Sequence, residues 1–171
     1  MRRLVLLTAI ATSLIGGVTR GEYVDAVSGL RLRSAPSLEA EIVKVLPFGE
    51  EVNGEIKDGW MKTDDGYLKT DFLSKKNPLD DYDYMGNWML TAYTHTGCAC
   101  ANGPYPTAGY TVACNSLPLG TEIYISEIGF RTVEDRGPQS MPGEWLDLFL
   151  DGYSECVSFG VQYHDVYIKK P

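Results

Sequence analysis

Apolar and polar residues alternate over short distances through the N-terminal half of the chain, and turn residues separate the alternating runs. Five short runs of this kind follow one another from Glu22 to Ser74. Leu30 and Leu32 alternate with arginines in the first run, and the turn at 64–66 joins the last two. A period of two is typical of strands with one buried face. The segment is therefore predicted to form a small β-barrel.

The C-terminal half shows the same pattern with longer runs. Its alternating or β-branched segments, each predicted to be a strand, cover residues 87–95, 110–115, 121–126 and 161–169. The segment Asp151–Gly160 is predicted to form a short helix that Gly160 ends. With Gly 18 and Pro 9 and no long stretch of helical period, the chain is predicted to be all-β with two small domains. The polar segment 75–86 between them is interpreted as a linker.

Two aspartates near the C-terminal end have apolar neighbours. Asp135 follows a short β-type run, and Asp147 shares one face of an alternating run with Trp145 and Phe149. Loss of water raises the pKa of a carboxyl group. Carbohydrate-cleaving enzymes place a carboxyl group with a raised pKa beside an ionised one, so that the first acts as the acid and the second as the base. The alternative is that Asp147 only accepts backbone hydrogen bonds or pairs with an arginine such as Arg136.

Charge and the N-terminal residues restrict the partners and the location. The formal net charge of −8 argues against nucleic acid, because phosphate binding needs clustered lysines and arginines. Arg2 and Arg3 precede the uncharged run Leu4–Val18, which predicts an export signal cut after Gly21. The run is short for a membrane span, and an uncleaved anchor is the alternative. In both cases the folded part is expected outside the cytoplasm, secreted or at the cell wall, with no stable membrane insertion once the signal is removed.

The cysteines lie in the C-terminal half. An even number in an exported chain predicts disulfides, with three possible pairings among Cys98, Cys100, Cys114 and Cys156. A zinc site that includes His95 is the alternative, although C-x-C spacing is tight for zinc. A cysteine with His164 could also suggest a peptidase, but the usual setting of that nucleophile is missing. The acidic run at 80–83 lacks the spacing of a calcium loop and is interpreted as solvated.

A series of motifs runs through the N-terminal half. GLRLRSAPS, VLPFGEEV, KDGWMKT and DGYLKTDFLS follow one another between residues 22 and 74. They resemble the landmarks of the bacterial SH3-like domain over this whole segment. The resemblance implies a small barrel that binds cell-wall peptide or glycan and is rarely catalytic. A structural spacer without a ligand is the alternative.

A second series of motifs covers the C-terminal half. The segments are, in order, LTAYT, TAGYTVACN, LPLGTEIYI, EDRG, EWLDLF and ECVSFG, followed by VYI. In this order they resemble the 3D domain, which is named for three aspartates and found in lytic transglycosylases. The resemblance, over residues 87–170, implies a six-stranded double-psi β-barrel with a groove for a glycan strand. It also implies cleavage of the MurNAc–GlcNAc β-1,4 bond without water, which leaves a 1,6-anhydro-MurNAc end.

The resemblance also assigns roles to residues. Asp147 matches the general acid that protonates the glycosidic oxygen and then, as a base, takes the proton of the C6 hydroxyl. Asp135 matches the aspartate that supports the oxocarbenium-like charge. The groove that binds the glycan would be lined by Tyr93, Thr94, Asn115 and Gly137. The family reaction needs no cofactor or metal. The expected partner is the peptidoglycan glycan strand, and the protein is expected to be a monomer.

Two features depart from the family pattern. The first of the three aspartates falls on Asn115, which keeps the size and hydrogen bonding of aspartate but not its charge. The loop between Asp135 and Asp147 is one residue longer than is usual and carries two prolines. The alternative function is therefore a non-catalytic wall-binding protein that has lost the chemistry.

Overall fold

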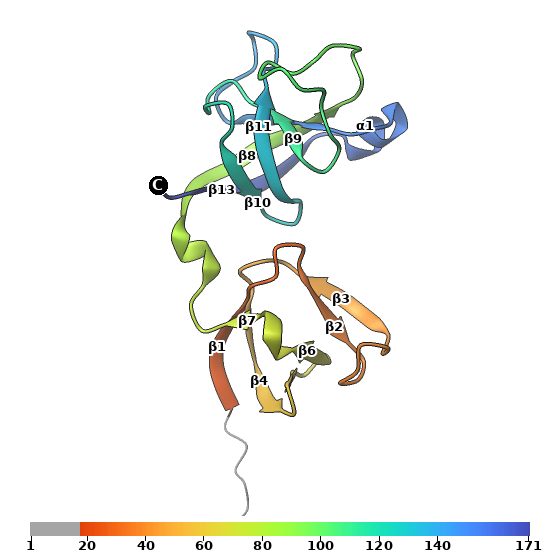
Figure 1. The fold of residues 1–171 in the computed structure, drawn as a ribbon, viewed down its shortest axis with the longest axis vertical. Coiled ribbons are helices and arrows are strands. Elements are labelled where there is room, and N and C mark those ends of the chain that lie inside the picture. The colour runs from red at the N-terminus through yellow and green to blue at the C-terminus, as the bar shows by residue number, and fades with distance from the viewer. Residues whose placement is uncertain (1–17) are drawn as a thin grey trace, which may run out of the picture.

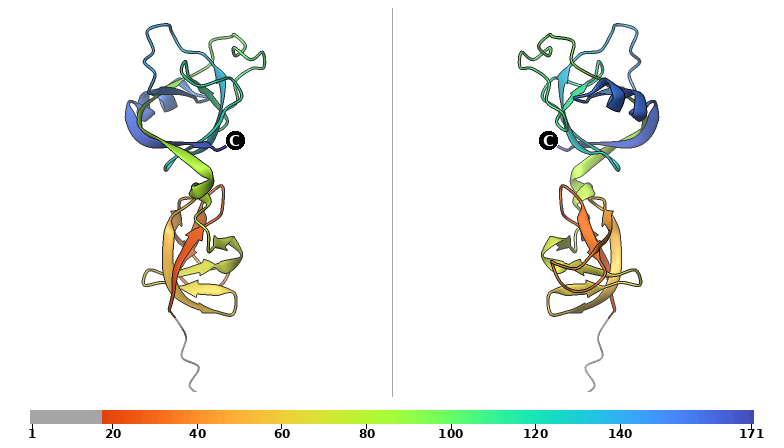
Figure 2. Two further views of the ribbon diagram at one scale, coloured as in Figure 1. Left: turned by 90° about the vertical axis from the view of Figure 1, so that its left-hand side faces the viewer. Right: turned by 90° about the vertical axis from the view of Figure 1, so that its right-hand side faces the viewer.

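A computed structural model describes residues 18–171, and it is all-β (Figure 1). An antiparallel sheet and a closed six-stranded barrel follow one another along the chain, one at each end of an elongated molecule (Figure 2). This confirms the predicted fold class of two β units. Most of the predicted export signal, residues 1–17, lies outside the described residues. Among those described, no helix is long and apolar enough to cross a membrane.

The N-terminal sheet is antiparallel and has the strand order β3-β2-β6-β5-β4-β1-β7. Its core contains Leu32, Met61 and Leu68, each at most 1% exposed. The strands are β1 (Val18–Val24), β2 (Leu30–Arg33), β3 (Ile42–Leu46), β4 (Glu51–Lys57), β5 (Trp60–Lys62), β6 (Tyr67–Lys69) and β7 (Leu73–Ser74), with the 3-10 helix η1 (Thr70–Phe72) before β7. Because β1 starts at Val18, the predicted cut after Gly21 would leave it the pairs Glu22↔Val52 and Tyr23↔Glu51.

The C-terminal barrel closes in the strand order β10-β11-β9-β12-β8-β13. Two of its pairings, β11 with β9 and β12 with β8, are parallel, and the others are antiparallel. The strands are β8 (Tyr82–Tyr93), β9 (Thr111–Ala113), β10 (Glu122–Ile125), β11 (Gly129–Asp135), β12 (Trp145–Phe149) and β13 (Gln162–Lys169). Leu90, Val112, Ile123, Val133 and Leu146 fill the interior and are 0% exposed. The alternating patterns of the sequence therefore mark the strands of this barrel.

A short helix, α1 (Tyr153–Phe159), precedes the last strand and contacts β8. Gly160 ends it with φ 62, a left-handed backbone that favours glycine. At the other end, Glu155 accepts a hydrogen bond from the Gly152 amide at 3.2 Å. The predicted helix and its glycine stop are both confirmed.

The segment 75–86, interpreted from the sequence as a linker, is partly regular structure. It contains the 3-10 helix η2 (Pro78–Asp81) and the first five residues of β8, in which Tyr82 pairs with Lys169. The acidic side chains of this segment do face solvent, and Asp81 forms an ion pair with Lys76. Tyr82 packs against Phe48 and Phe130, and the exposed Tyr84 contacts the ring of Tyr167, so the charge pattern hid a strand.

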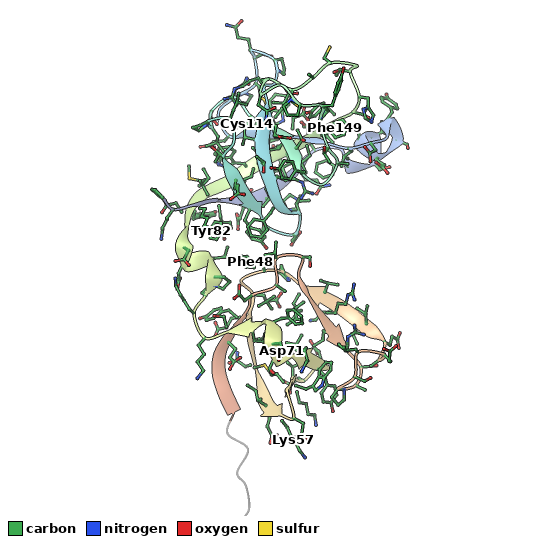
Figure 3. The ribbon with its side chains drawn as sticks, in the orientation of Figure 1. Phe48, Lys57, Asp71, Tyr82, Cys114 and Phe149 are labelled. Atoms are coloured by element: carbon green, nitrogen blue, oxygen red, sulfur yellow. The ribbon has the colours of Figure 1, made fainter. Side chains whose placement is uncertain are left out.

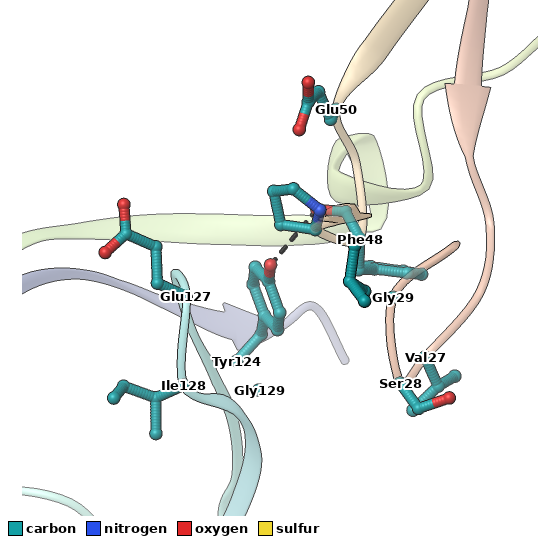
Figure 4. Close-up of a pocket in the computed structure, with 11 residues that line it drawn as sticks. Val27, Ser28, Gly29, Phe48, Glu50, Tyr124, Glu127, Ile128 and Gly129 are labelled. Carbon is teal, nitrogen blue, oxygen red and sulfur yellow. Dashed lines mark hydrogen bonds between the residues drawn. The ribbon is translucent and has the colours of Figure 1, made fainter. Parts of the chain in front are cut away.

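Aromatic side chains join the two units (Figure 3). Phe48, in the turn between β3 and β4, is 7% exposed. Its ring centroid lies 5.2 Å from that of Phe130, 5.4 Å from that of Tyr124 and 6.3 Å from that of Tyr82. The Tyr124 hydroxyl also donates to the Phe48 carbonyl at 3.1 Å, beside a pocket of about 490 Å³ (Figure 4). Phe48 therefore makes the sheet and the barrel pack against each other.

Candidate active site

The strand order of the barrel places the two predicted aspartates on either side of the same residue of β9. Thr91 on β8 pairs with Asp147 on β12, Asp147 pairs with Ala113 on β9, and Ala113 pairs with Asp135 on β11. The backbones of the two aspartates are thus two strand spacings apart, about 10 Å. Alanine is the residue between them, so no long side chain separates the two carboxyl groups.

An irregularity in β11 sets the direction of Asp135. The pairing of β11 with β9 shifts between Val133 and Asp135, so Glu134 has no partner of its own in that register. Glu134 points instead to a second network, in which Thr111 Oγ1 donates to it at 2.6 Å and Asn102 Nδ2 at 3.1 Å. Without the extra residue, Glu134 would stand opposite Ala113. The bulge therefore gives Asp135 its place beside Asp147, a use of bulges that is common near active sites.

Asp147 is half-buried, and a chain of hydrogen bonds holds it. Thr91 Oγ1 donates to Asp147 Oδ1 at 2.6 Å and accepts from Trp145 Nε1 at 2.7 Å. Because an indole N–H can only donate, it helps to direct the threonine hydroxyl towards the carboxyl group. While Thr91 donates to Oδ1, the carboxyl proton is left to the other oxygen, Oδ2. The arrangement thus distinguishes the two oxygens of one carboxyl group.

The surroundings favour the protonated form of Asp147. Burial raises its pKa above the ordinary value, the hydrogen bond from Thr91 opposes this, and the negative charge of Asp135 raises the pKa further. The two carboxyl groups are therefore electrostatically coupled. A carboxyl group that keeps its proton above the usual range can donate that proton to a substrate.

Asp135 accepts three hydrogen bonds. Its Oδ1 accepts from the backbone amides of Ala101 at 3.0 Å and Arg136 at 2.8 Å, and its Oδ2 accepts from the Tyr93 hydroxyl at 3.2 Å. Burial, followed by the charge of Asp135, raises the pKa of Tyr93 well above its ordinary value. Tyr93 therefore stays a donor, and both oxygens of Asp135 are engaged as acceptors.

The loop between Asp135 and Asp147 is fastened to the end of β9. Asn115 Nδ2 donates to the Pro138 carbonyl at 2.9 Å, and Asn115 Oδ1 accepts from the Gly137 amide at 3.1 Å. At the other end of the loop, Ser116 Oγ donates to the Gly143 carbonyl at 2.5 Å. These contacts form what we call the loop clasp. Asn115 is its centre because an amide side chain can donate and accept at once.

The structure thus brings Asp147, Asp135 and Tyr93 together, whereas the other predicted site residues have different surroundings. Asn115 and Gly137 belong to the loop clasp. Thr94 follows β8, and its hydroxyl donates to the Asp151 carbonyl at 3.0 Å. These three residues shape the loops beside the two carboxyl groups and have no direct bond to either in the described residues.

Two site residues were not identified from the sequence. Thr91 touches Asp147 directly, and Ala113 separates the two aspartates. The alternation of β8 offered a signal for Thr91, since it lies two residues before Tyr93 and so shares its face of the strand. No such signal exists for Ala113, because its role depends on which strands are neighbours.

The predicted disulfides are absent from the structure. All four cysteines are free thiols, namely Cys98, Cys100, Cys114 and Cys156. Burial raises the thiol pKa of both Cys100 and Cys156, and the charges of Asp135 and Asp147 respectively add to this. The even number of cysteines led to the expectation of pairing, but cysteine count does not report position: Cys98 and Cys100 lie in the loop after β8, Cys114 follows β9 and Cys156 lies on α1.

The zinc site and the Cys/His peptidase site both require side chains that gather in one place. No three His, Cys, Asp or Glu side chains of residues 18–171 gather in a way that could hold a metal ion. His164 interacts with Gln162, at 2.8 Å, and with Glu127, at 3.8 Å. In the described residues it has no contact with a cysteine, so the structure offers no Cys/His pair there.

Comparison with known proteins adds no family. No protein-family model matches the chain, and no match is found among curated proteins or among solved structures. Function is therefore inferred from the coupled carboxyl groups and from the resemblance of the sequence motifs.

Proposed function

We propose that the protein is a secreted lytic transglycosylase that cleaves the MurNAc–GlcNAc β-1,4 bond of peptidoglycan. The observation that carries this proposal is the half-buried Asp147, whose pKa is raised by burial and by the charge of Asp135. The motif resemblance to the 3D domain supplies the substrate class. In the same proposal the N-terminal sheet is an SH3-like unit that holds the protein on the cell wall.

In the proposed mechanism Asp147 acts twice. Its Oδ2 proton passes to the glycosidic oxygen, the bond from that oxygen to C1 breaks, and the GlcNAc end leaves as an alcohol. The C6 hydroxyl of the same MurNAc then bonds to C1 and loses its proton to the Asp147 carboxylate. The acid is regenerated, and no water is consumed. A single carboxyl group can serve both steps because the nucleophile belongs to the substrate.

Asp135 supports this cycle through its charge. Tyr93 and two backbone amides hold the Asp135 carboxyl group in place, and its negative charge favours the proton on Asp147 before cleavage. The same negative charge stabilises the positive charge that develops at C1 as the leaving oxygen departs. Thr91 acts as a positioning residue, since its bond to Oδ1 leaves Oδ2 to carry the transferred proton.

A non-catalytic wall-binding protein is the second candidate, and Asn115 is the residue that favours it. The loop clasp gives this asparagine another explanation. Aspartate could still accept from the Gly137 amide, but it could not donate to the Pro138 carbonyl 2.9 Å away. An amide at this position therefore serves the loop and does not by itself indicate lost chemistry.

The test is mass spectrometry of purified sacculi digested with the protein lacking residues 1–21. The parent is expected to release 1,6-anhydro-MurNAc products, and Asp147→Asn is expected to lose at least about 10³-fold in rate. The matched control is Asp83→Asn, which changes an exposed aspartate on β8. Hydrated reducing ends would instead mean hydrolysis. Wall binding without any product from the parent would favour the second candidate.

A further inference from the structure

On the outer face of the N-terminal sheet, one row of paired residues places an aromatic side chain between two lysines. On β5, Trp60 pairs with Lys57 of β4 on one side and with Lys69 of β6 on the other. Lys69 Nζ lies 5.7 Å from the centroid of the Trp60 ring and is already bound to Asp71 at 3.3 Å. One cation of this row is thus engaged within the protein, whereas Lys57 has no ion-pair partner in residues 18–171.

A second row lies directly beside the first. Lys62 pairs with Glu55 of β4 on one side and with Tyr67 of β6 on the other. The residue between the rows on β5, Met61, points to the core and is 0% exposed. Trp60 and Tyr67 are therefore diagonal neighbours on the outer face, within reach of one ligand.

These residues line a concave surface. Apart from Lys69, the residues of the two rows surround a pocket of about 610 Å³ together with Asp58 and with Pro36 from the loop after β2. Asp58 belongs to the two-residue Asp58-Gly59 turn between β4 and β5, where both residues have positive φ, 51 and 78. The tight turn fixes an acidic side chain at the edge of the pocket. The volume is in the range of pockets that bind small organic ligands.

The charged groups of this pocket have no partners in the protein. Within residues 18–171, the side chains of Lys57, Lys62, Glu55 and Asp58 form no hydrogen bond or ion pair. Glu55 and Lys62 are direct neighbours across the two strands, yet they are not paired with each other. Two ammonium groups and two carboxylates thus surround half-buried aromatic rings and remain available to a ligand.

We propose that this concave face binds a short peptide that carries both a free ammonium group and a free carboxylate. The carboxylate would lie between Lys57 and Lys62, the ammonium group near Glu55 and Asp58, and the apolar part of the peptide on Trp60. A purely anionic ligand would meet two carboxylates, and a neutral sugar would leave four charges without counter-charges. The inference rests on the proposed function only for the source of the peptide, which would be the cell wall.

The test is titration of the full chain with trialanine that has free termini, followed through the indole N–H resonance of Trp60. Binding is expected for this peptide and not for the same peptide with an acetylated amino end and an amidated carboxyl end. Trp60→Ala is expected to weaken binding at least about 10-fold, and Lys62→Glu to do the same while leaving the aromatic rings in place. For these variants binding is followed through shifts of the backbone amides of β5 and β6.

The controls separate folding from recognition. Trp60→Phe keeps an aromatic floor and should retain most of the affinity, and Lys75→Gln removes an exposed lysine outside the pocket without effect. The proposal would be overturned if the blocked peptide bound equally well or if trialanine did not bind. Binding of tetra-N-acetylchitotetraose in place of trialanine would overturn it as well. Asp147→Asn should bind trialanine like the parent, so a failure here is distinguishable from a failure of the proposed catalysis.

Discussion

The candidate site of the C-terminal barrel and the pocket of the N-terminal sheet differ in how their polar side chains are bonded. In the barrel, Asp147, Asp135 and Asn115 are each held by named hydrogen bonds inside the protein. On the outer face of the sheet, Lys57 and Lys62 have no such partner in the described residues. Groups that are to perform chemistry must be directed before the substrate arrives, whereas groups that only bind gain by staying free. Because of this contrast we propose catalysis for the barrel and recognition for the sheet.

The contact between the two units offers the test with the largest expected effect. Phe48→Ala removes a buried ring that packs against Tyr124 and Phe130, and we expect it to lower the free energy of unfolding by about 3–5 kcal/mol. Urea denaturation measures this, and Phe48→Leu should cost less. A loss below about 1 kcal/mol would mean that the sheet and the barrel are stable independently of this contact.

The direction of the Asp147 carboxyl group offers the next test. Thr91→Val removes the hydroxyl that donates to Oδ1 and leaves the Trp145 indole without its acceptor. We expect the turnover of sacculi to fall about 100-fold, or about 2.7 kcal/mol in activation free energy. Because the bond from Thr91 lowers the pKa of Asp147, its loss should move the alkaline limb of the pH–rate profile to higher pH. Thr91→Ser should retain both the rate and the limb.

The matched variant on the other side of Asp147 should move the same limb in the opposite direction. Asp135→Asn removes the negative charge that raises the pKa of Asp147, so the alkaline limb should move to lower pH. Opposite shifts for Thr91→Val and Asp135→Asn identify Asp147 as the titrating acid. Shifts in the same direction would assign the limb to another group.

The loop clasp distinguishes the two candidate functions. Asn115→Asp restores the aspartate of the family pattern but removes the donor to the Pro138 carbonyl, and we expect it to cost about 1–2 kcal/mol of stability and to lower the activity. Asn53→Asp makes the same substitution on β4, away from the loop clasp, and is the matched control. A rise in activity for Asn115→Asp would show that the family charge is missing, as the second candidate function requires.

The sequence allowed the fold to be predicted further than the site. Period-two alternation is a local property, so it revealed the strands and the faces of Asp147 and Trp145 before any neighbour was known. The pairing of Asp147 with Thr91 is parallel and its pairing with Ala113 is antiparallel, and both join strands far apart in the chain, which local pattern does not contain. Cysteine count and acidic composition misled for the same reason, since neither reports what the side chains meet in space.

The smallest expected effect is a change in stability caused by the half-buried carboxyl group of Asp147. The pKa of Asp147 is raised in the folded protein, so folding favours its protonated form, and stability falls as pH rises from the unfolded pKa of about 3.9 through the folded value. Asp147→Asn can still accept from Thr91 and carries no charge. Its unfolding midpoint should therefore exceed that of the parent at pH 7, and the difference should shrink towards pH 4. At the exposed Asp83 the same substitution should give no such gain, and an equal gain there would mean that burial of Asp147 is not its cause.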